Sequence, residues 1–458
     1  MKQFVIYSYH GVCDDWYAVD GDKTQLGASL QTLENTKLYK DAGFNVMFVS
    51  YVFGIDAREE NFETSKMKSV MDMAYSQGLK CFVHESNIFR LSQSETSLID
   101  PQNADGTTVF ASQEELNEFI EGCISDIIGH PAFYGFTFKD EPSYKMFTAM
   151  GQLYRAIKSV VPNAFVNINI LPYWDTEGFR ECYCENGAAL TCKEAYANYL
   201  QSYYDLIGSD TLQYDDYPLK GDDTVKEAHL INLKMVADFC KEKGITFYKV
   251  FQACALDTTL GAANRKPTEM DMYWQMNIGM AMGIRGYSYW SYYPVINSQG
   301  EYYDETASFV NRNGEPNELY YIMQHIHAEM QKMAKVLMNF EYVGSQLHTK
   351  EPPGEYNVYL QGFENDEFAY AKNVHLSENG AVLVTELKDE EKNGYGYYFV
   401  NVVDPVTQAP QTVSVEFEGR TVAAVYKNGE VKYVFLENNR LTVKLECGEG
   451  VFVLPLPY

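Results

Sequence analysis

Residues 1–344 alternate short apolar or aromatic runs with longer amphipathic stretches, and they do so eight times. A strand followed by a helix, repeated along a chain, is typical of a parallel sheet with crossover helices. The short runs predict strands at residues 3–10, 44–51, 80–85, 133–139, 164–171, 211–216, 246–252 and 285–292. The longer stretches predict helices at residues 24–42, 63–77, 112–128, 144–160, 190–207, 223–243, 267–282 and 315–338.

Eight such units over this length fit a closed (β/α)₈ barrel, also called a TIM barrel. The alternative is an open doubly wound sheet, which usually carries a glycine-rich phosphate-binding turn after its first strand. Here that turn reads YHGVCDDW, at residues 9–16, and it lacks the GxGxxG pattern. We therefore expect an α/β fold with a barrel at residues 1–344.

The predicted helix at residues 63–77 shows how its boundaries follow from the sequence. Thr64 or Ser65 can cap its start, and Gly78 lies just past its end, where a positive φ is needed. Apolar side chains recur there at a spacing of three or four residues and predict its buried face: Met67, Val70, Met71 and Ala74.

The pattern changes after residue 344. Residues 355–458 contain short runs of alternating polarity, separated by turn signals such as ENG, KNG and ENN, and they show no helical period. This pattern is typical of an antiparallel β-sandwich. We expect it as a small second domain at residues 345–458 that packs on the barrel, with HTKEPPGE at residues 348–355 as the linker or first turn.

The net charge and the composition limit the kinds of molecule that this protein is expected to bind. The net charge of −27 repels a phosphate backbone, which argues against a nucleic-acid partner. The start, MKQFVIYSYHG, enters a strand pattern without the features of a signal peptide, and no apolar run is long enough to span a membrane. Most of the nine cysteines occur singly, which favours free thiols. We expect a soluble protein, cytoplasmic as the sequence stands, or secreted or periplasmic if a signal peptide has been removed.

In a barrel of this kind the functional side chains lie at the C-terminal ends of the strands. In this chain those ends are rich in carboxylates and aromatic rings and carry almost no Lys or Arg. Glycoside hydrolysis needs two carboxylates and an aromatic platform for the sugar, and it needs no cofactor. The candidates for such a carbohydrate site are His10, His84, Glu85, Asp140, Glu141, Asn169, Trp174, Asp215, Asp216, Tyr217, Gln252, Trp290 and Tyr292.

The segment GFTFKDEPS at residues 135–143 resembles the strand-4 motif of the TIM-barrel glycoside hydrolases, the clan that includes cellulase-like and family-42 β-galactosidase-like enzymes. QYDDYPL (213–219), YKVFQAC (248–254) and the segment from Arg265 to Pro294 are similar to their counterparts in that clan. The resemblance implies hydrolysis of O-glycosidic bonds, with Glu141 as the acid/base. It also implies that Trp290 is the sugar-stacking aromatic residue, which a cis peptide often follows.

One position departs from the clan pattern. Retaining members place a Glu nucleophile at the end of strand 7, where this chain has Gln252. The second carboxylate could instead be Asp215 or Asp216, or it could be Asp257 or a loop acid such as Glu269. Alternatively there is no nucleophile, in an inverting, weakly active or non-catalytic protein. We favour strand 6, because two adjacent residues at a strand end point to opposite faces and one should face the barrel axis. We prefer Asp216 slightly over Asp215.

The other candidates are expected to bind substrate, with Asp140 orienting the acid or holding a sugar hydroxyl. Two further functions stay open. The first is a non-catalytic glycan-binding protein on a degenerate barrel without the strand-7 nucleophile. The second is a metal-dependent hydrolase that uses His10, His84 and Asp215, although such sites usually need more histidines at strand ends and the chain has eight in all. We expect no metal and no cofactor.

Overall fold

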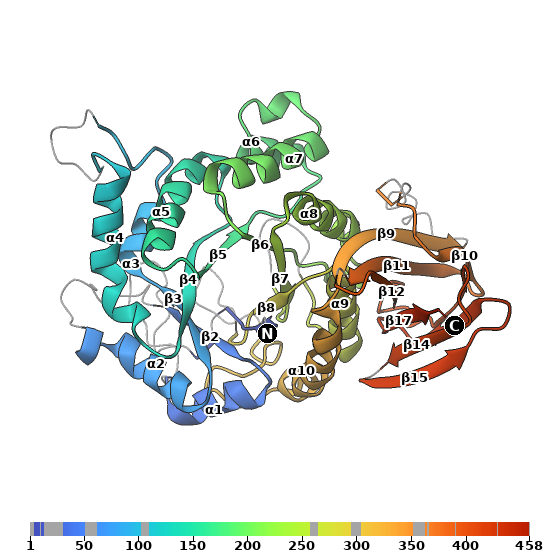
Figure 1. Cartoon of the computed structure of the whole chain (residues 1–458). Helices are drawn as coiled ribbons and strands as arrows, with labels where there is room; N and C mark the ends of the chain where they lie inside the picture. Colours follow the sequence, from blue (N-terminus) through green and yellow to red (C-terminus); the bar gives the residue numbers. More distant parts are fainter. Residues whose placement is uncertain are drawn as a thin grey trace.

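The computed structural model describes residues 4–9, 11–12, 31–50, 62–101, 110–256, 264–294, 304–350, 362–363, 366–389, 391–427 and 429–457. Its first part is an eight-stranded parallel sheet in the order β1-β8-β7-β6-β5-β4-β3-β2. Helices surround the strands, and the second part of the chain lies beside α9 and α10 (Figure 1). The strands are β1 (Val5–Ile6), β2 (Val46–Ser50), β3 (Lys80–His84), β4 (Phe133–Asp140), β5 (Phe165–Ile170), β6 (Thr211–Asp215), β7 (Thr246–Gln252) and β8 (Gly286–Trp290).

Asn45, just before β2, closes the sheet between β1 and β2, the two strands at the ends of the sheet order. Its backbone N–H donates to the carbonyl of Ile6 at 3.0 Å. Its side-chain Nδ2 donates to the carbonyl of Phe4 at 2.7 Å, and its Oδ1 accepts from the N–H of Ile6 at 2.9 Å. The amide thus satisfies backbone groups at the seam that would otherwise lack a strand partner. The predicted (β/α)₈ barrel is confirmed.

The predicted helices all occur, with ends that differ by a few residues from those expected. Two short helices, α3 and α6, follow β3 and β5 and were not predicted. The first helix was expected at residues 24–42, but it begins at Leu33, after the N-cap residue Thr32; residues 24–30 lie outside the described residues. The helices are α1 (Leu33–Asp41), α2 (Lys66–Ser76), α3 (Ser86–Ser92), α4 (Gln113–Ile128), α5 (Phe147–Val160), α6 (Arg180–Tyr183), α7 (Cys192–Ser202), α8 (His229–Lys243), α9 (Glu269–Ala281) and α10 (Glu318–Leu337).

Helix α2 shows how the local signals act. Ser65 is the N-cap residue, and its hydroxyl accepts a hydrogen bond from the N–H of Lys68, which satisfies one of the free donors of the first turn. Gly78 has a φ of 70°, as expected for the residue that ends the helix. The buried face consists of the four predicted residues, Met67, Val70, Met71 and Ala74.

The second part of the chain is the predicted antiparallel β-sandwich. A six-stranded sheet in the order β15-β14-β17-β12-β11-β9 packs against a three-stranded sheet in the order β10-β13-β16. β13 shows the expected alternation of buried and half-buried residues along one strand. The strands are β9 (Glu341–Lys350), β10 (Ala371–Leu376), β11 (Gly380–Asp389), β12 (Gly394–Asn401), β13 (Gln411–Phe417), β14 (Val422–Lys427), β15 (Glu430–Phe435), β16 (Arg440–Leu445) and β17 (Gly450–Leu456).

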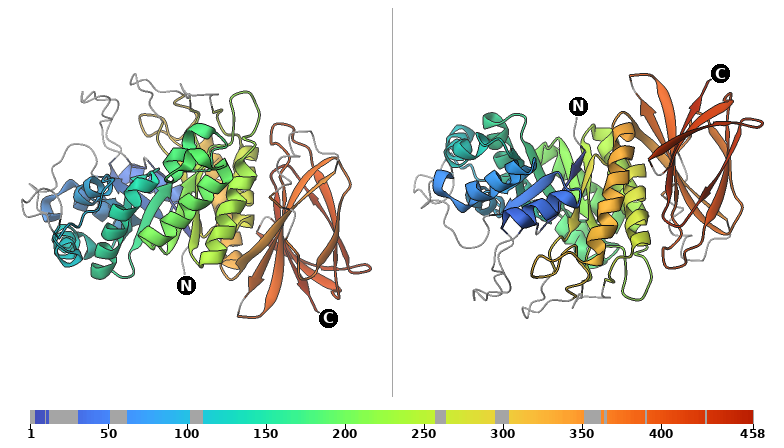
Figure 2. Two further views of the ribbon diagram at one scale, coloured as in Figure 1. Left: turned by 90° about the horizontal axis from the view of Figure 1, so that it is seen from above. Right: turned by 90° about the horizontal axis from the view of Figure 1, so that it is seen from below.

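The sandwich packs on the barrel through α9, as both views in Figure 2 show. Asn277 of α9 donates from Nδ2 to the carbonyl of Gly448 at 2.9 Å and accepts at Oδ1 from the hydroxyl of Tyr398 at 2.8 Å. Gly448 has a φ of 67°, and a Cβ at this position would lie 2.8 Å from the backbone nitrogen of Trp274. The close approach of the two domains therefore requires glycine here.

Large apolar side chains fill the barrel interior below the strand ends. Val5, Tyr7, Val46, Phe82 and Tyr248 form one buried cluster there, with Tyr7 and Phe82 in edge-to-face contact at 4.9 Å. The barrel is therefore a packed core, and chemistry is confined to its C-terminal end. Within the described residues, no helix is both long enough and apolar enough to cross a bilayer.

Candidate active site

A layer of hydrogen-bonded polar side chains lies inside the barrel, directly below the strand ends. The hydroxyl of Tyr7 donates to Gln213 Oε1 at 2.7 Å and accepts from Asn167 Nδ2 at 2.8 Å. The hydroxyl of Tyr9 accepts from Gln213 Nε2 at 3.0 Å. These bonds connect the first, fifth and sixth strands, so the residues that follow at the strand ends have fixed relative positions.

Asn169, in β5, holds two carboxylates together. Its Nδ2 donates to Asp140 Oδ1 at 2.8 Å and to Asp215 Oδ1 at 3.0 Å. The side chain is buried, with 2% exposed, and its Oδ1 has no hydrogen-bond partner among the described residues. Because the two carboxylates fix the position of Nδ2, they also fix Oδ1 as a buried acceptor beside them.

Glu141 directly follows β4 in a turn that directs its side chain toward Asp215. Its φ is 45°, in the left-handed region that few residues other than glycine adopt. Its backbone N–H donates to the carbonyl of Asn169 at 2.8 Å, and the hydroxyl of Tyr199 donates to the carbonyl of Pro142 at 2.6 Å. The carboxyl groups of Glu141 and Asp215 lie close enough for the charge of Asp215 to be the largest influence on the pKa of Glu141.

Mutual repulsion and burial make these three acids weak. The charge of Asp215, followed by burial and the charge of Asp140, raises the pKa of Glu141 to about 9. Burial, and then the charge of Asp215, raise the pKa of Asp140 to about 6. Glu141 and Asp140 keep contact with solvent at the barrel end, whereas Asp215 is buried. A proton on Glu141 at neutral pH is the arrangement that an acid catalyst needs.

Asp215 has neighbours that favour its ionised form. Burial raises its pKa, but Lys249 and hydrogen bonds from Tyr217 and Asn169 act in the opposite direction. Lys249, in β7, lies over the ring of Tyr214 at 4.5 Å on the outer face of the sheet, and burial lowers its pKa to about 8. Most neighbours of Glu141 among the described residues instead raise its pKa, so the proton belongs on Glu141 and the charge on Asp215.

The preference for Asp216 over Asp215 is corrected by the structure. Asp216 contacts the N-terminal end of α8, where its carboxylate lies 2.6 Å from Lys226 Nζ and 2.7 Å from His229 Nδ1. Burial raises its pKa, but Lys226 and His229 outweigh this and leave the pKa well below its usual range. Burial also lowers the pKa of His229, so the imidazole is neutral at pH 7 and the charged partner is Lys226. Asp216 is thus committed to a buried ion pair.

We predict that Asp216→Asn lowers the free energy of unfolding by about 3 kcal/mol at pH 7, because it leaves Lys226 without its buried counter-charge. Since the folded-state pKa of Asp216 is lowered, its contribution to stability is present above the pKa of the unfolded state and is lost as the pH falls below about 4. Urea unfolding at pH 7 and pH 3 measures both effects. A difference between wild type and variant that is as large at pH 3 as at pH 7 would contradict the ion-pair assignment.

Two predicted substrate contacts are also corrected, because their side chains are buried in other interactions. The amide of Gln252 is fully buried and bonds to the backbone of three loop residues. Tyr292 is 2% exposed, and its ring packs against Tyr39, Phe44 and Phe309. Neither side chain has a surface that a sugar could contact.

Trp174 is a packing residue in this structure and not an open platform for a sugar. Its ring stacks on Phe179, with centroids 5.0 Å apart and an interplanar angle of 13°. The ammonium group of Lys226 lies 4.2 Å from the centroid of the same ring. The expected stacking of Trp174 on substrate is therefore replaced by a role in holding Lys226.

The remaining predicted residues lie around the carboxylates or nearby. Trp290 is half-buried, with its ring 6.1 Å from that of Tyr9, and the peptide bond to Ser291 is cis. Glu85 caps α3 by accepting from the N–H of Ile88 at 2.8 Å, a structural use of its carboxylate. His84 is buried, and burial lowers its pKa to about 4, so it is neutral. His10 lies outside the described residues.

Several residues of the site were missed: Tyr9, Asn167, Gln213 and Lys226. Polar residues alternate with apolar ones in FVNINI and TLQYD, which places Asn167 with Asn169 and Gln213 with Asp215, so a signal for the inner face was present. Lys226 lies in a loop and gave no such signal. In the part of the chain that the structure covers, no three His, Cys, Asp or Glu side chains are arranged to hold a metal ion.

Comparisons with known proteins connect this geometry to a fold. No family model matches the chain, and no curated protein matches it in sequence. Among solved structures, a glycoside hydrolase of family 5 from Bacteroides vulgatus has a TM-score of 0.51 at 10% identity, over 99% of this chain and 88% of that one. An Anoxybacillus α-amylase has a TM-score of 0.49 at 11% identity, over 99% and 98% of the two chains. At these identities the likeness to the family-5 structure establishes the fold alone, which agrees with the barrel and sandwich described above.

Proposed function

We propose that this protein is a glycoside hydrolase that cleaves O-glycosidic bonds in an oligo- or polysaccharide, with Glu141 as the acid/base and Asp215 as the second carboxylate. The observation that carries the proposal is the group of three carboxyl side chains that Asn169 holds at the C-terminal end of the barrel, in which Asp215 raises the pKa of Glu141. Two carboxyl groups with different ionisation tendencies on one site are what glycoside hydrolysis requires.

The two carboxyl groups have separate roles. Glu141, protonated at neutral pH, donates its proton to the oxygen of the leaving group as the glycosidic bond breaks. Asp215, ionised and held by Asn169 and Tyr217, attacks the anomeric carbon and forms a glycosyl-enzyme ester. Glu141, now ionised, then takes a proton from the water that hydrolyses this ester. Each step uses a group whose charge state the surrounding residues already favour.

The closeness of the two carboxyl groups favours retention of configuration. Inverting enzymes separate their carboxyl groups by about 6.5–9.5 Å to leave room for a water molecule, and retaining enzymes by about 5–5.5 Å. The charge of Asp215 is the largest cause that raises the pKa of Glu141, as expected for two carboxyl groups at the shorter separation. Asp215 would therefore act as a nucleophile rather than as a base for water.

The neighbouring polar groups are suited to bind the sugar. Asn169 holds the two carboxylates through its Nδ2, and because its Oδ1 is buried, the sugar contacts fall to the groups around it. The carboxylate of Asp140 lies beside Asn169 Nδ2 and remains in contact with solvent, so it can bind a sugar hydroxyl. Trp290, half-buried above Tyr9, is the aromatic ring best placed to stack on a pyranose.

Asp140→Asn is expected to move the alkaline limb of the pH profile of kcat/KM to lower pH. The negative charge of Asp140 raises the pKa of Glu141, so its removal lowers that pKa, and Glu141 loses its proton at a lower pH. Asparagine keeps an oxygen that can accept the bond from Asn169. The pH profile of the wild type and the variant on one aryl glycoside measures the shift. If kcat/KM of the variant falls at the same pH as that of the wild type, or at a higher pH, then Glu141 is not the acid whose ionisation sets the alkaline limb.

Turnover on a panel of nitrophenyl glycosides and oligosaccharides, with binding measured in parallel by calorimetry, tests the function itself. We expect at least one substrate to be hydrolysed by the wild-type protein. The alternative, a glycan-binding protein without catalysis, is favoured by the absence of a carboxylate from the end of β7. Binding without turnover across the panel would support that alternative and contradict ours.

A further inference from the structure

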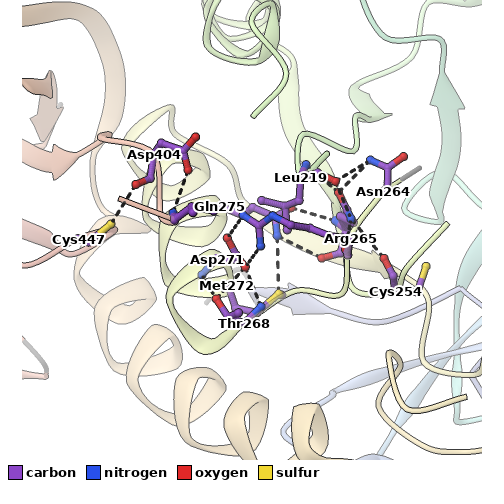
Figure 3. Close-up of polar contacts among 12 residues, drawn as sticks. Leu219, Cys254, Asn264, Arg265, Thr268, Asp271, Met272, Gln275, Asp404 and Cys447 are labelled. Atoms are coloured by element: carbon purple, nitrogen blue, oxygen red, sulfur yellow. Dashed lines mark hydrogen bonds and ion pairs between the residues drawn. The ribbon is translucent and has the colours of Figure 1, made fainter. Parts of the chain in front are cut away.

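The end of β7 carries an amide, Gln252, that bonds to Leu219, Cys254, Asn264 and Arg265, which are all labelled in Figure 3. Gln252 Oε1 accepts from the N–H of Leu219 at 3.0 Å and from Asn264 Nδ2 at 3.4 Å. Its Nε2 faces three carbonyl oxygens, those of Arg265 at 2.9 Å, Cys254 at 3.3 Å and Leu219 at 3.4 Å. The side chain therefore joins the end of β7 to the loop that follows β6.

Asn264 also forms hydrogen bonds with the backbone of the loop that follows β6. Its Nδ2 donates to the carbonyls of Tyr217 at 3.0 Å and Leu219 at 3.1 Å. The N–H of Arg265 donates to the carbonyl of Leu219 at 3.1 Å. We call Gln252 and Asn264 the amide clamp. Asn264 thus holds the backbone of Tyr217, whose side chain lies close enough to Asp215 for each to alter the pKa of the other.

The clamp explains why this position is an amide. A carboxylate here would direct a negative charge at three carbonyl oxygens and would have no proton to donate to any of them. Leaving buried carbonyls without donors, and a buried charge without a partner, are both costly. Gln252 is 0% exposed, so water cannot compensate. At this position the chain therefore has a glutamine, which donates hydrogen bonds to backbone carbonyls, and not the glutamate expected at the end of strand 7.

The clamp is anchored to a rigid element. The guanidinium of Arg265 forms a two-point ion pair with Asp271, with one contact of 2.7 Å. Asp271 is fully buried and also completes the capping box of α9 with Thr268, whose N–H donates to it at 2.7 Å. Because α9 packs against the sandwich, the clamp has little freedom to move.

We propose that Gln252 and Asn264 are positioning residues that hold the hydroxyl of Tyr217 against Asp215. This inference rests on the proposed function for the role of Asp215. The clamp contacts neither carboxylate directly and acts through the backbone of residues 217–219. It takes the place of the strand-7 carboxylate as the contribution of β7 to the site.

Gln252→Glu and Asn264→Ala test the proposal, with Tyr217→Phe as the reference and Gln324→Glu as the matched control. Gln324 donates to the carbonyl of Asp41 at an exposed site on α10, far from the barrel end. We expect each clamp variant to lower kcat by about 10²-fold, the loss that small misplacements of catalytic groups cause, with KM changed little. Combining Gln252→Glu with Tyr217→Phe should lower kcat no further than the more damaging single change. Gln324→Glu should behave like the wild type.

A second readout does not depend on turnover. Asp215 faces Asp140 at the end of β4, Glu141 after it, Asn169 of β5, Lys249 of β7, Tyr9 after β1 and Tyr217. The bond from Tyr217 lowers the pKa of Asp215, so losing it should raise that pKa in all three variants, as followed by ¹³C NMR of labelled aspartate carboxyls with Asp215→Asn for assignment. If the wild type hydrolyses no glycoside, the proposed function fails. The titration of Asp215 then tests by itself whether the clamp holds Tyr217 against Asp215.

Three results would overturn the positioning role. The first is a kcat of Gln252→Glu equal to that of the wild type. The second is a double variant whose losses multiply, which would show that the clamp acts independently of Tyr217. The third is loss of the native circular dichroism spectrum in both clamp variants, which would assign Gln252 and Asn264 to the stability of the fold.

Discussion

Glu141→Gln is expected to slow the hydrolysis of unactivated glycosides by about 10²–10⁴-fold, the contribution of general acid catalysis. Glutamine keeps the size of the side chain but cannot supply the proton that the leaving oxygen needs. Nitrophenyl glycosides should lose much less in the first step, because a nitrophenolate leaves without protonation. Steady-state rates on an oligosaccharide and on its nitrophenyl counterpart, measured with the same variant, reveal this difference.

Glu177→Gln is a matched control for that experiment. Glu177 lies beyond β5, and its side chain is 86% exposed and paired only loosely with Arg180, at 3.7 Å. It should retain wild-type rates on both substrates. Full turnover of the oligosaccharide by Glu141→Gln would remove the acid assignment.

Asp215→Asn is expected to cause the largest loss of activity, greater than the roughly 10²–10⁴-fold that a general acid contributes, and on activated and unactivated substrates alike. A neutral amide cannot form the glycosyl-enzyme ester, and leaving-group quality cannot replace a nucleophile. Asparagine preserves an oxygen that can accept from Asn169. Rates for the variant on both kinds of substrate provide the measurement.

Asp216→Asn offers the sharpest comparison, because it makes the same chemical change one residue away. Its carboxylate is committed to Lys226 and His229, so its loss should reduce stability much more than activity. Asp215→Asn should do the reverse, since it relieves repulsion among three acids. The opposite pattern in the two variants would restore the sequence-based preference for Asp216.

The sequence was sufficient to predict the barrel, the sandwich and the strand ends, since these follow from local periodicity and turn residues. It also contained the information that favours Asp215. In TLQYD, Leu212 and Tyr214 are apolar, whereas Gln213 and Asp215 are polar, so the polar pair shares the inner face. The alternation alone does not show which set faces the barrel axis, because both faces of a barrel strand are buried and either can accept a large side chain.

The wrong assignments share another cause. Gln252, Trp174 and Tyr292 all follow strands at the functional end of the barrel, and their residue types suit sugar binding. Their partners come from distant parts of the chain: Leu219 for Gln252, Lys226 for Trp174 and Phe44 for Tyr292. Loop packing of this kind depends on tertiary contacts that no local pattern records.

Chemical rescue with azide tests most directly whether Glu141 and Asp215 act from opposite sides of one anomeric carbon. Asp215→Gly and Glu141→Ala are each incubated with an activated aryl glycoside and sodium azide, and the products are identified by proton NMR. We predict that Asp215→Gly forms a glycosyl azide of inverted configuration, because azide takes the place of the missing nucleophile. Glu141→Ala should form one of retained configuration, because azide attacks the ester on Asp215. No rescue in either variant, or the same configuration from both, would contradict the assignment of the pair.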